Sequence, residues 1–84
     1  MRLALVLVEE QQMKRSTQDA VLKAEPNAVC VFVKGKALIT IGTAWDAVTL
    51  GIDRSGNPAF AWRDAVAHLK WMKRNLGLYQ DWQP

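Results

Sequence analysis

The side chain best suited to catalysis in this 84-residue sequence is His68, its only histidine. A Ser-His-Asp or Cys-His arrangement would have to use this residue, and a metal site built from several histidines is excluded. His68 falls between the apolar and polar sides of a predicted helix, and Asp64 one turn earlier is placed to pair with it. A general base also needs a positioned nucleophile and a pocket. We therefore interpret His68 as a solvated or boundary residue and expect no enzymatic activity.

Carboxylates and glycines point to no reaction either. Most of the eight carboxylates fall at predicted element ends or turns, where capping and solvation explain them better than acid/base chemistry or metal binding. These carboxylates are Glu9, Glu10, Asp19, Glu25, Asp46, Asp53, Asp64 and Asp81. The glycines form no phosphate-binding loop before a helix. We predict no metal site, no nucleotide site and no cofactor.

Positive charge gathers between Asn57 and Leu78, although the net charge of the chain is only +3. On a helical wheel this segment carries a narrow basic stripe with Trp71 beside it, almost opposite the side that carries Leu69. Such cations can meet phosphates or acidic side chains, and an exposed indole can stack on a base or fill a pocket. The alternative is that another element covers Trp71 and the cations only solvate the helix. The predicted binding face comprises Arg63, Lys70, Trp71, Lys73 and Arg74.

The helix that positions this face has clear ends. Asn57 is a good cap and Pro58 suits the first helical position, so the helix begins there and runs to about Leu76. Gly77 suits a left-handed end. Its predicted core stripe is Trp62, Ala65, Val66, Leu69, Met72 and Leu76.

A β-hairpin is predicted from Ala28 to Ile41. Two runs rich in β-branched residues, Ala28 to Val33 and Ala37 to Ile41, are separated by Lys34-Gly35-Lys36. The only cysteine, Cys30, lies in the first run, so we expect a buried thiol and no intrachain disulfide. This cysteine usage fits a reducing cytoplasm.

The segment from residue 43 to residue 52 has two interpretations. Thr43-Ala44-Trp45-Asp46 has the form of a capping box and predicts a two-turn helix ended by Gly51. A strand from Trp45 to Ile52 is the alternative. We expect Trp45 and Trp62 to pack in the core, whereas the place of Trp82 is undetermined.

The N-terminal third is predicted to hold a strand and a short helix. The apolar run Leu3 to Val8 suits a buried strand, with a helix as the alternative, and is too short for a membrane span or signal peptide. Ser16 or Thr17 could cap a helix over residues 18–24 that Pro26 stops, and this helix could also begin as early as Glu9.

Several features between Gln18 and Gln83 follow the order of a known domain. They are a helix end and Pro-led turn at Leu22 to Ala28, an apolar strand at Val29 to Val33, Gly35, and a helix from Phe60 to Gly77. This order resembles the N-terminal, mismatch-binding domain of MutS proteins, which implies a small mixed sheet with flanking helices that contacts nucleic acid. The family's Phe-x-Glu motif, which reads the mispair, would fall where this chain has Ala37 and Ile39. The resemblance therefore does not imply mismatch recognition.

Together these patterns predict a single domain over residues 1–84 of the α/β class, in its α+β form. We expect a small mixed or antiparallel sheet containing the hairpin, with the long C-terminal helix packed on one face. The first functional hypothesis is a non-enzymatic module that binds nucleic acid. The second is a protein-interaction factor, of the sort that phages and mobile elements encode against a host complex, which binds an acidic protein surface. No membrane partner is expected, and the small size is compatible with a homodimer.

Overall fold

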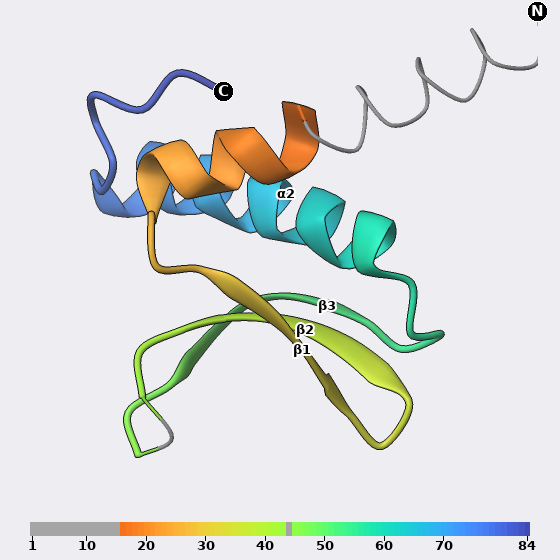
Figure 1. The fold of residues 1–84 in the computed structure, drawn as a ribbon. Helices are drawn as coiled ribbons and strands as arrows, with labels where there is room; N and C mark the ends of the chain where they lie inside the picture. Colours follow the sequence, from red (N-terminus) through yellow and green to blue (C-terminus); the bar gives the residue numbers. More distant parts are fainter. Residues whose placement is uncertain (1–15, 44) are drawn as a thin grey trace, which may run out of the picture.

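The computed structural model describes residues 16–43 and 45–84, which form a three-stranded sheet covered on one side by helices. Along the chain come a helical segment at 16–24, β1 (Val29–Val33), β2 (Lys36–Ile41), β3 (Val48–Asp53) and α2 (Pro58–Leu76). The strands are antiparallel in the order β1-β2-β3, and the two helical parts lie on the same side of the sheet (Figure 1). The predicted α+β fold, with its hairpin and long C-terminal helix, is confirmed.

The hairpin turn consists of two residues, Lys34 and Gly35. Their φ angles are 50° and 78°, and two successive left-handed residues are what a tight two-residue turn between twisted strands requires. Lys36, predicted to lie in the connection, instead pairs with Val33 as the first residue of β2. Cys30 is half-buried instead of fully buried, because β1 is an edge strand of the sheet.

The predicted helix after Thr43 is wrong, and the strand alternative holds from Val48 onward. The capping contacts do form: the amide and hydroxyl of Thr43 donate to Asp46 Oδ1 over 3.1 and 2.5 Å, and the Asp46 amide donates to the Thr43 carbonyl over 3.2 Å. They close a turn, after which β3 pairs with β2. Trp45 lies in this turn and is 99% exposed, so its predicted place in the core is also wrong.

Both predicted ends of α2 are confirmed. The Asn57 side chain accepts a hydrogen bond of 3.0 Å from the Ala59 amide, and Pro58 occupies the first turn. At the other end Gly77 has φ 69° and ψ 17°, and its amide donates to the Met72 carbonyl. Since a left-handed residue cannot continue the helix, the chain leaves α2 there.

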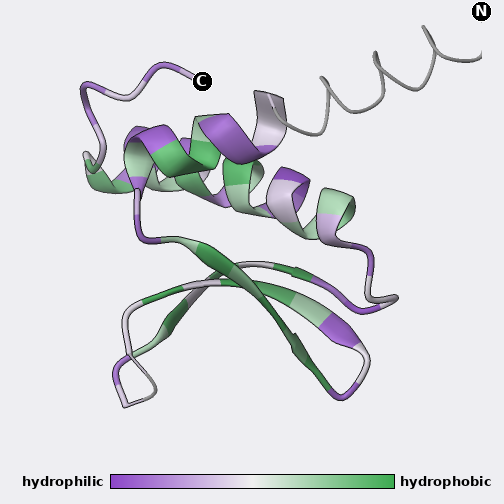
Figure 2. Ribbon diagram, in the orientation of Figure 1, coloured by the Kyte–Doolittle hydropathy of each residue, from purple (hydrophilic) through white to green (hydrophobic). Residues whose placement is uncertain are grey.

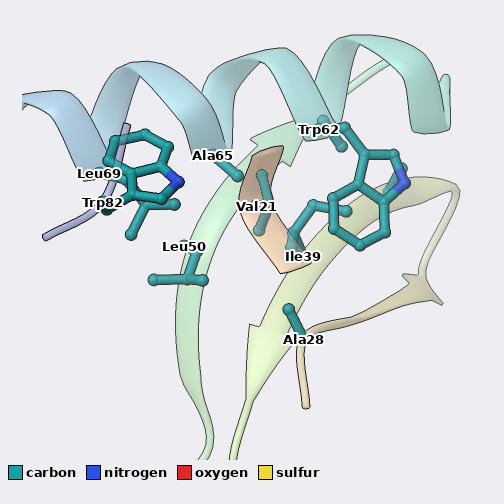
Figure 3. Packing of buried hydrophobic residues seen from close by; sticks show 10 residues of the cluster. Val21, Ala28, Ile39, Leu50, Trp62, Ala65, Leu69 and Trp82 are labelled. Carbon is teal, nitrogen blue, oxygen red and sulfur yellow. The ribbon is translucent and has the colours of Figure 1, made fainter. Parts of the chain in front are cut away.

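One side of α2 packs on the sheet, as its periodicity predicts. The buried residues of α2 are Ala61, Trp62, Ala65 and Leu69. Figure 3 shows Val21 of the segment 16–24 and Ile39 of β2 lying below Ala65, and all three are fully buried. Leu76 is 55% exposed, contrary to prediction, because Tyr79 and Trp82 of the following tail pack against the core in its place.

The C-terminal tail, residues 77–84, folds back toward the helical segment 16–24 (Figure 1). Trp82 is buried, and its indole donates a hydrogen bond of 2.6 Å to the Ala20 carbonyl. The Tyr79 hydroxyl donates to Glu25 Oε1 over 2.6 Å, and the Lys73 amine donates to the Trp82 carbonyl. The tail therefore joins α2 to the segment 16–24.

The segment 16–24 confirms the predicted short helix, which ends before Pro26. Ser16 and Thr17 already lie inside it, so neither is the residue that precedes its first turn. The predicted strand from Leu3 to Val8 and the alternative start at Glu9 lie outside the described residues. Across the part of the chain that the structure describes, no helix is both long and apolar enough to cross a membrane.

Candidate binding face on α2

Three cations of the predicted binding face lie on the side of α2 turned away from the sheet. Arg63, Lys70 and Arg74 are all exposed, and their spacing of seven and four residues brings them to one side of the helix. Within the described residues, none of the three forms an ion pair. They present their charges to solvent along two-thirds of the length of α2.

Trp71 lies beside this row and is 52% exposed. No element of the described chain covers the indole, so the alternative in which Trp71 is buried is wrong. Its ring centroid is 6.3 Å from that of His68, with the planes tilted by 43°, and its carbonyl accepts a hydrogen bond of 2.9 Å from Asn75. We call Arg63, Lys70, Trp71 and Arg74 the basic face.

Lys73, the fifth predicted residue, lies on another side of α2. Its amine is bound to the Trp82 carbonyl, so it holds the tail and is not part of the exposed row. It borders a shallow hollow of about 370 Å³. The hollow is lined by Lys70, Lys73, Arg74, Gln80, Trp82 and Pro84.

Phe60 is a neighbour of the basic face that the sequence analysis did not identify. It is 49% exposed, and the Arg63 guanidinium lies 5.7 Å from the centroid of its ring. The signal was present in the spacing: Phe60 lies three residues before Arg63 and eleven before Trp71, which is about three helical turns. The spacing of the cations alone does not identify this exposed aromatic residue, which lies one turn before Arg63.

His68 and Asp64 do not pair with each other, contrary to prediction. Asp64 Oδ2 accepts a hydrogen bond of 2.9 Å from the Ile52 amide, and His68 Nδ1 lies 2.9 Å from the Leu50 carbonyl. Since a carbonyl only accepts, Nδ1 is the donor in this hydrogen bond. Both side chains satisfy backbone groups of β3, an edge strand that would otherwise expose them. The two side chains therefore join α2 to the edge of the sheet.

Two carboxylates on turns have the capping role that was predicted. Asp53 Oδ2 accepts from the Ser55 hydroxyl and the Asn57 amide over 2.5 and 2.7 Å, and these bonds lower the pKa of Asp53. Bonds from the hydroxyl and amide of Thr43 lower the pKa of Asp46 in the same way. Among the residues that the structure describes, no three His, Cys, Asp or Glu side chains are grouped to hold a metal ion.

The face of the sheet away from the helices is a second exposed surface. Strand alternation and the register place Val29, Val31 and Val33 of β1 on this face with Leu38 and Ile52 of the neighbouring strands. Val29, Val33 and Ile52 are exposed, and Figure 2 shows hydrophobic colour along much of the three strands. We call these five residues the open sheet face.

No protein family, curated protein or solved structure matches this chain in the comparisons. The resemblance to the mismatch-binding domain of MutS proteins therefore stays a prediction. Ala37 and Ile39, at the positions of the family's Phe-x-Glu, are fully buried in the core.

Proposed function

We propose that the protein is a non-enzymatic binding module that contacts nucleic acid through the basic face of α2. The observation that carries the proposal is the exposed row of Arg63, Lys70 and Arg74 beside a half-exposed Trp71, on the side of α2 opposite its buried residues. A row of cations matches the repeating negative charge of a phosphate backbone, and an indole matches the flat face of a base.

Two further observations support this choice of face. The cations form no ion pair within the described residues, so a ligand would not have to displace a protein carboxylate from them. The carboxylate on the flank of α2, Asp64, accepts a hydrogen bond from β3. Its charge is thereby directed toward the sheet edge.

The test is the salt dependence of oligonucleotide binding. Each phosphate contact releases condensed counterions, so the logarithm of affinity should fall linearly with the logarithm of salt concentration. Lys70→Ala and Arg74→Ala should each lower this slope by about one unit. Lys36→Ala, which removes an exposed cation from the hairpin, should leave it unchanged. Absence of binding to duplex and single-stranded oligonucleotides at low salt would refute the proposal.

The open sheet face favours a second candidate function, a protein-interaction factor. Contiguous exposed apolar residues often mark protein interfaces, and Trp45, in the turn between β2 and β3, is 99% exposed. In that case Val31→Lys should abolish complex formation with the protein partner, whereas Lys70→Ala should affect mainly the association rate. Affinity purification with and without nuclease treatment would distinguish the two functions.

A further inference from the structure

The exposed aromatic rings of α2 are arranged in a way that a phosphate-binding surface alone does not require. Phe60 and Trp71 are separated by eleven residues, which at 3.6 residues per turn brings both to the same side of the helix. Both rings are about half exposed. The three cations of the basic face run alongside them, so α2 carries two parallel rows, one aromatic and one basic.

We infer that the ligand of this face is single-stranded nucleic acid, with bases stacked on Phe60 and Trp71 and phosphates beside Arg63, Lys70 and Arg74. This inference rests on the proposed function and specifies its ligand. Stacking on aromatic side chains beside a basic track is the usual means by which proteins hold single strands, because unpaired bases offer their faces. In a duplex those faces are covered by neighbouring base pairs, and the two rings would have nothing to stack on.

The contacts of each ring agree with this role. The Arg63 guanidinium lies 5.7 Å from the Phe60 centroid, so a cation accompanies this ring as Lys70 and Arg74 accompany Trp71. The Trp71 indole has His68 as its aromatic neighbour, and His68 is held by the Leu50 carbonyl. A ring supported on one side by a fixed neighbour loses little conformational freedom when a base stacks on it.

The spacing of the rings also sets the length of the ligand. At a rise of about 1.5 Å per residue, Phe60 and Trp71 lie about 16.5 Å apart along the helix axis. A strand with about 3.4 Å between successive bases spans this distance in about five steps, so about six nucleotides are needed to place a base on each ring. A trinucleotide can therefore stack on only one ring at a time, whereas an octanucleotide can use both.

The experiment compares fluorescently labelled oligothymidylates of three and eight nucleotides with a 20-base-pair duplex, at one low salt concentration. The octanucleotide should bind more tightly than both the trinucleotide and the duplex. Phe60→Ala and Trp71→Ala should each weaken octanucleotide binding by about 5- to 150-fold, toward the affinity of the trinucleotide, and leave the salt slope unchanged. Phe60→Tyr and Trp71→Phe, which keep a ring, should restore most of the affinity.

Trp45→Ala is the matched control, because it removes an exposed indole from the β2–β3 turn, which lies across the sheet from α2 (Figure 1). It should bind the octanucleotide like the parent protein. The Trp45→Phe variant gives an independent measurement, since Trp62 and Trp82 are buried and Trp71 then remains as the one exposed indole. Octanucleotide should quench its fluorescence and duplex should not.

The outcomes separate this inference from the proposed function. If Phe60→Ala and Trp71→Ala bind like the parent while Lys70→Ala and Arg74→Ala lose affinity, the proposed function stands and base stacking is refuted. Tighter binding of duplex than of octanucleotide would refute it as well. If no oligonucleotide binds at low salt, the proposed function itself fails.

Discussion

Replacement of Gly51 by alanine tests how closely α2 approaches the sheet. Gly51 lies in β3 and is buried against α2. A Cβ atom added there would lie 2.5 Å from the Ala65 amide nitrogen and 2.9 Å from its Cα, and closer still to the Ala61 carbonyl oxygen. All three are backbone atoms of the helix, so no change of rotamer can relieve the contacts. Gly51→Ala must move α2 away from β3.

The expected cost follows from that geometry. Overpacking a core by a methyl group costs about 1–3 kcal/mol, occasionally more, and rigid backbone contacts place this site at the upper end. We expect a loss of about 3 kcal/mol, which corresponds to a fall of about 12–24 °C in melting temperature for a domain of this size. Without such contacts Gly51→Ala should raise the stability instead of lowering it. Gly→Ala at an ordinary backbone conformation stabilises a protein by about 0.4–1 kcal/mol.

Thermal denaturation followed by circular dichroism is the assay. Gly35→Ala is the matched control, since nothing lies within 4 Å of an added Cβ there and only the left-handed backbone, with φ +78°, is strained. That strain costs about 1–2 kcal/mol, so this variant should melt above Gly51→Ala. The double variant Gly51→Ala with Ala65→Gly should not recover, because the contacts are with backbone. A melting temperature of Gly51→Ala equal to or above that of the parent would refute the close approach.

Two further predictions concern the core and the tail. Leu69 is fully buried on α2, so Leu69→Ala should lower the free energy of unfolding by about 2–5 kcal/mol in chemical denaturation, and an unchanged midpoint would contradict the assigned core face. Burial and the carboxylate of Glu25 raise the pKa of Tyr79 to about 12, above its value of 10.0 in the unfolded chain. The stabilisation by the protonated phenol is therefore complete below pH 10 and is lost as the pH rises from about 10 toward 12. Melting temperatures across this range should fall less in Tyr79→Phe than in the parent, and equal falls would argue against the Tyr79–Glu25 bond.

The elements that the sequence predicted well are those with local causes. Asn57 and Pro58 begin α2, and Gly77 ends it, through bonds to residues a few positions away. The hairpin turn likewise depends on the backbone of Lys34 and Gly35 alone. Such features need no knowledge of the rest of the fold, so a pattern of residue types is sufficient to predict them.

The segment after Thr43 shows where local patterns mislead. Thr43 and Asp46 make the contacts of a capping box, and the same contacts can close either a helix turn or an isolated turn. Pairing with β2 favours the isolated turn over the helix. As a strand, this segment gains backbone hydrogen bonds to β2, and its Gly51 permits the close approach of α2. The wrong place predicted for Trp45 follows from the wrong choice of a helix for this segment, since in a helix its side chain could have turned inward.

The candidate site was predicted in part for a similar reason. Helical spacing was enough to place Arg63, Lys70 and Arg74 together, because all three belong to one helix. The position of the Lys73 side chain depends on its bond to the tail. The roles of Asp64 and His68 depend on their bonds to β3, an element that precedes the helix by more than a turn of sequence and is placed by its pairing with β2. A helical wheel shows which residues share a side of α2, but not which other element lies against that side.

The division of α2 into sides connects the fold to the proposed function. Ala65 and Leu69 pack on the sheet, and the flank with Asp64 and His68 closes the edge of β3. Trp82 and Tyr79 of the tail hold the helical segment 16–24 beside the helix. Contacts on these sides fix the position of α2, so the rings and cations on its remaining side are carried by a rigid support. A ligand therefore meets rows whose spacing along the helix is already set, so binding has to order only the side chains and not the backbone that carries them.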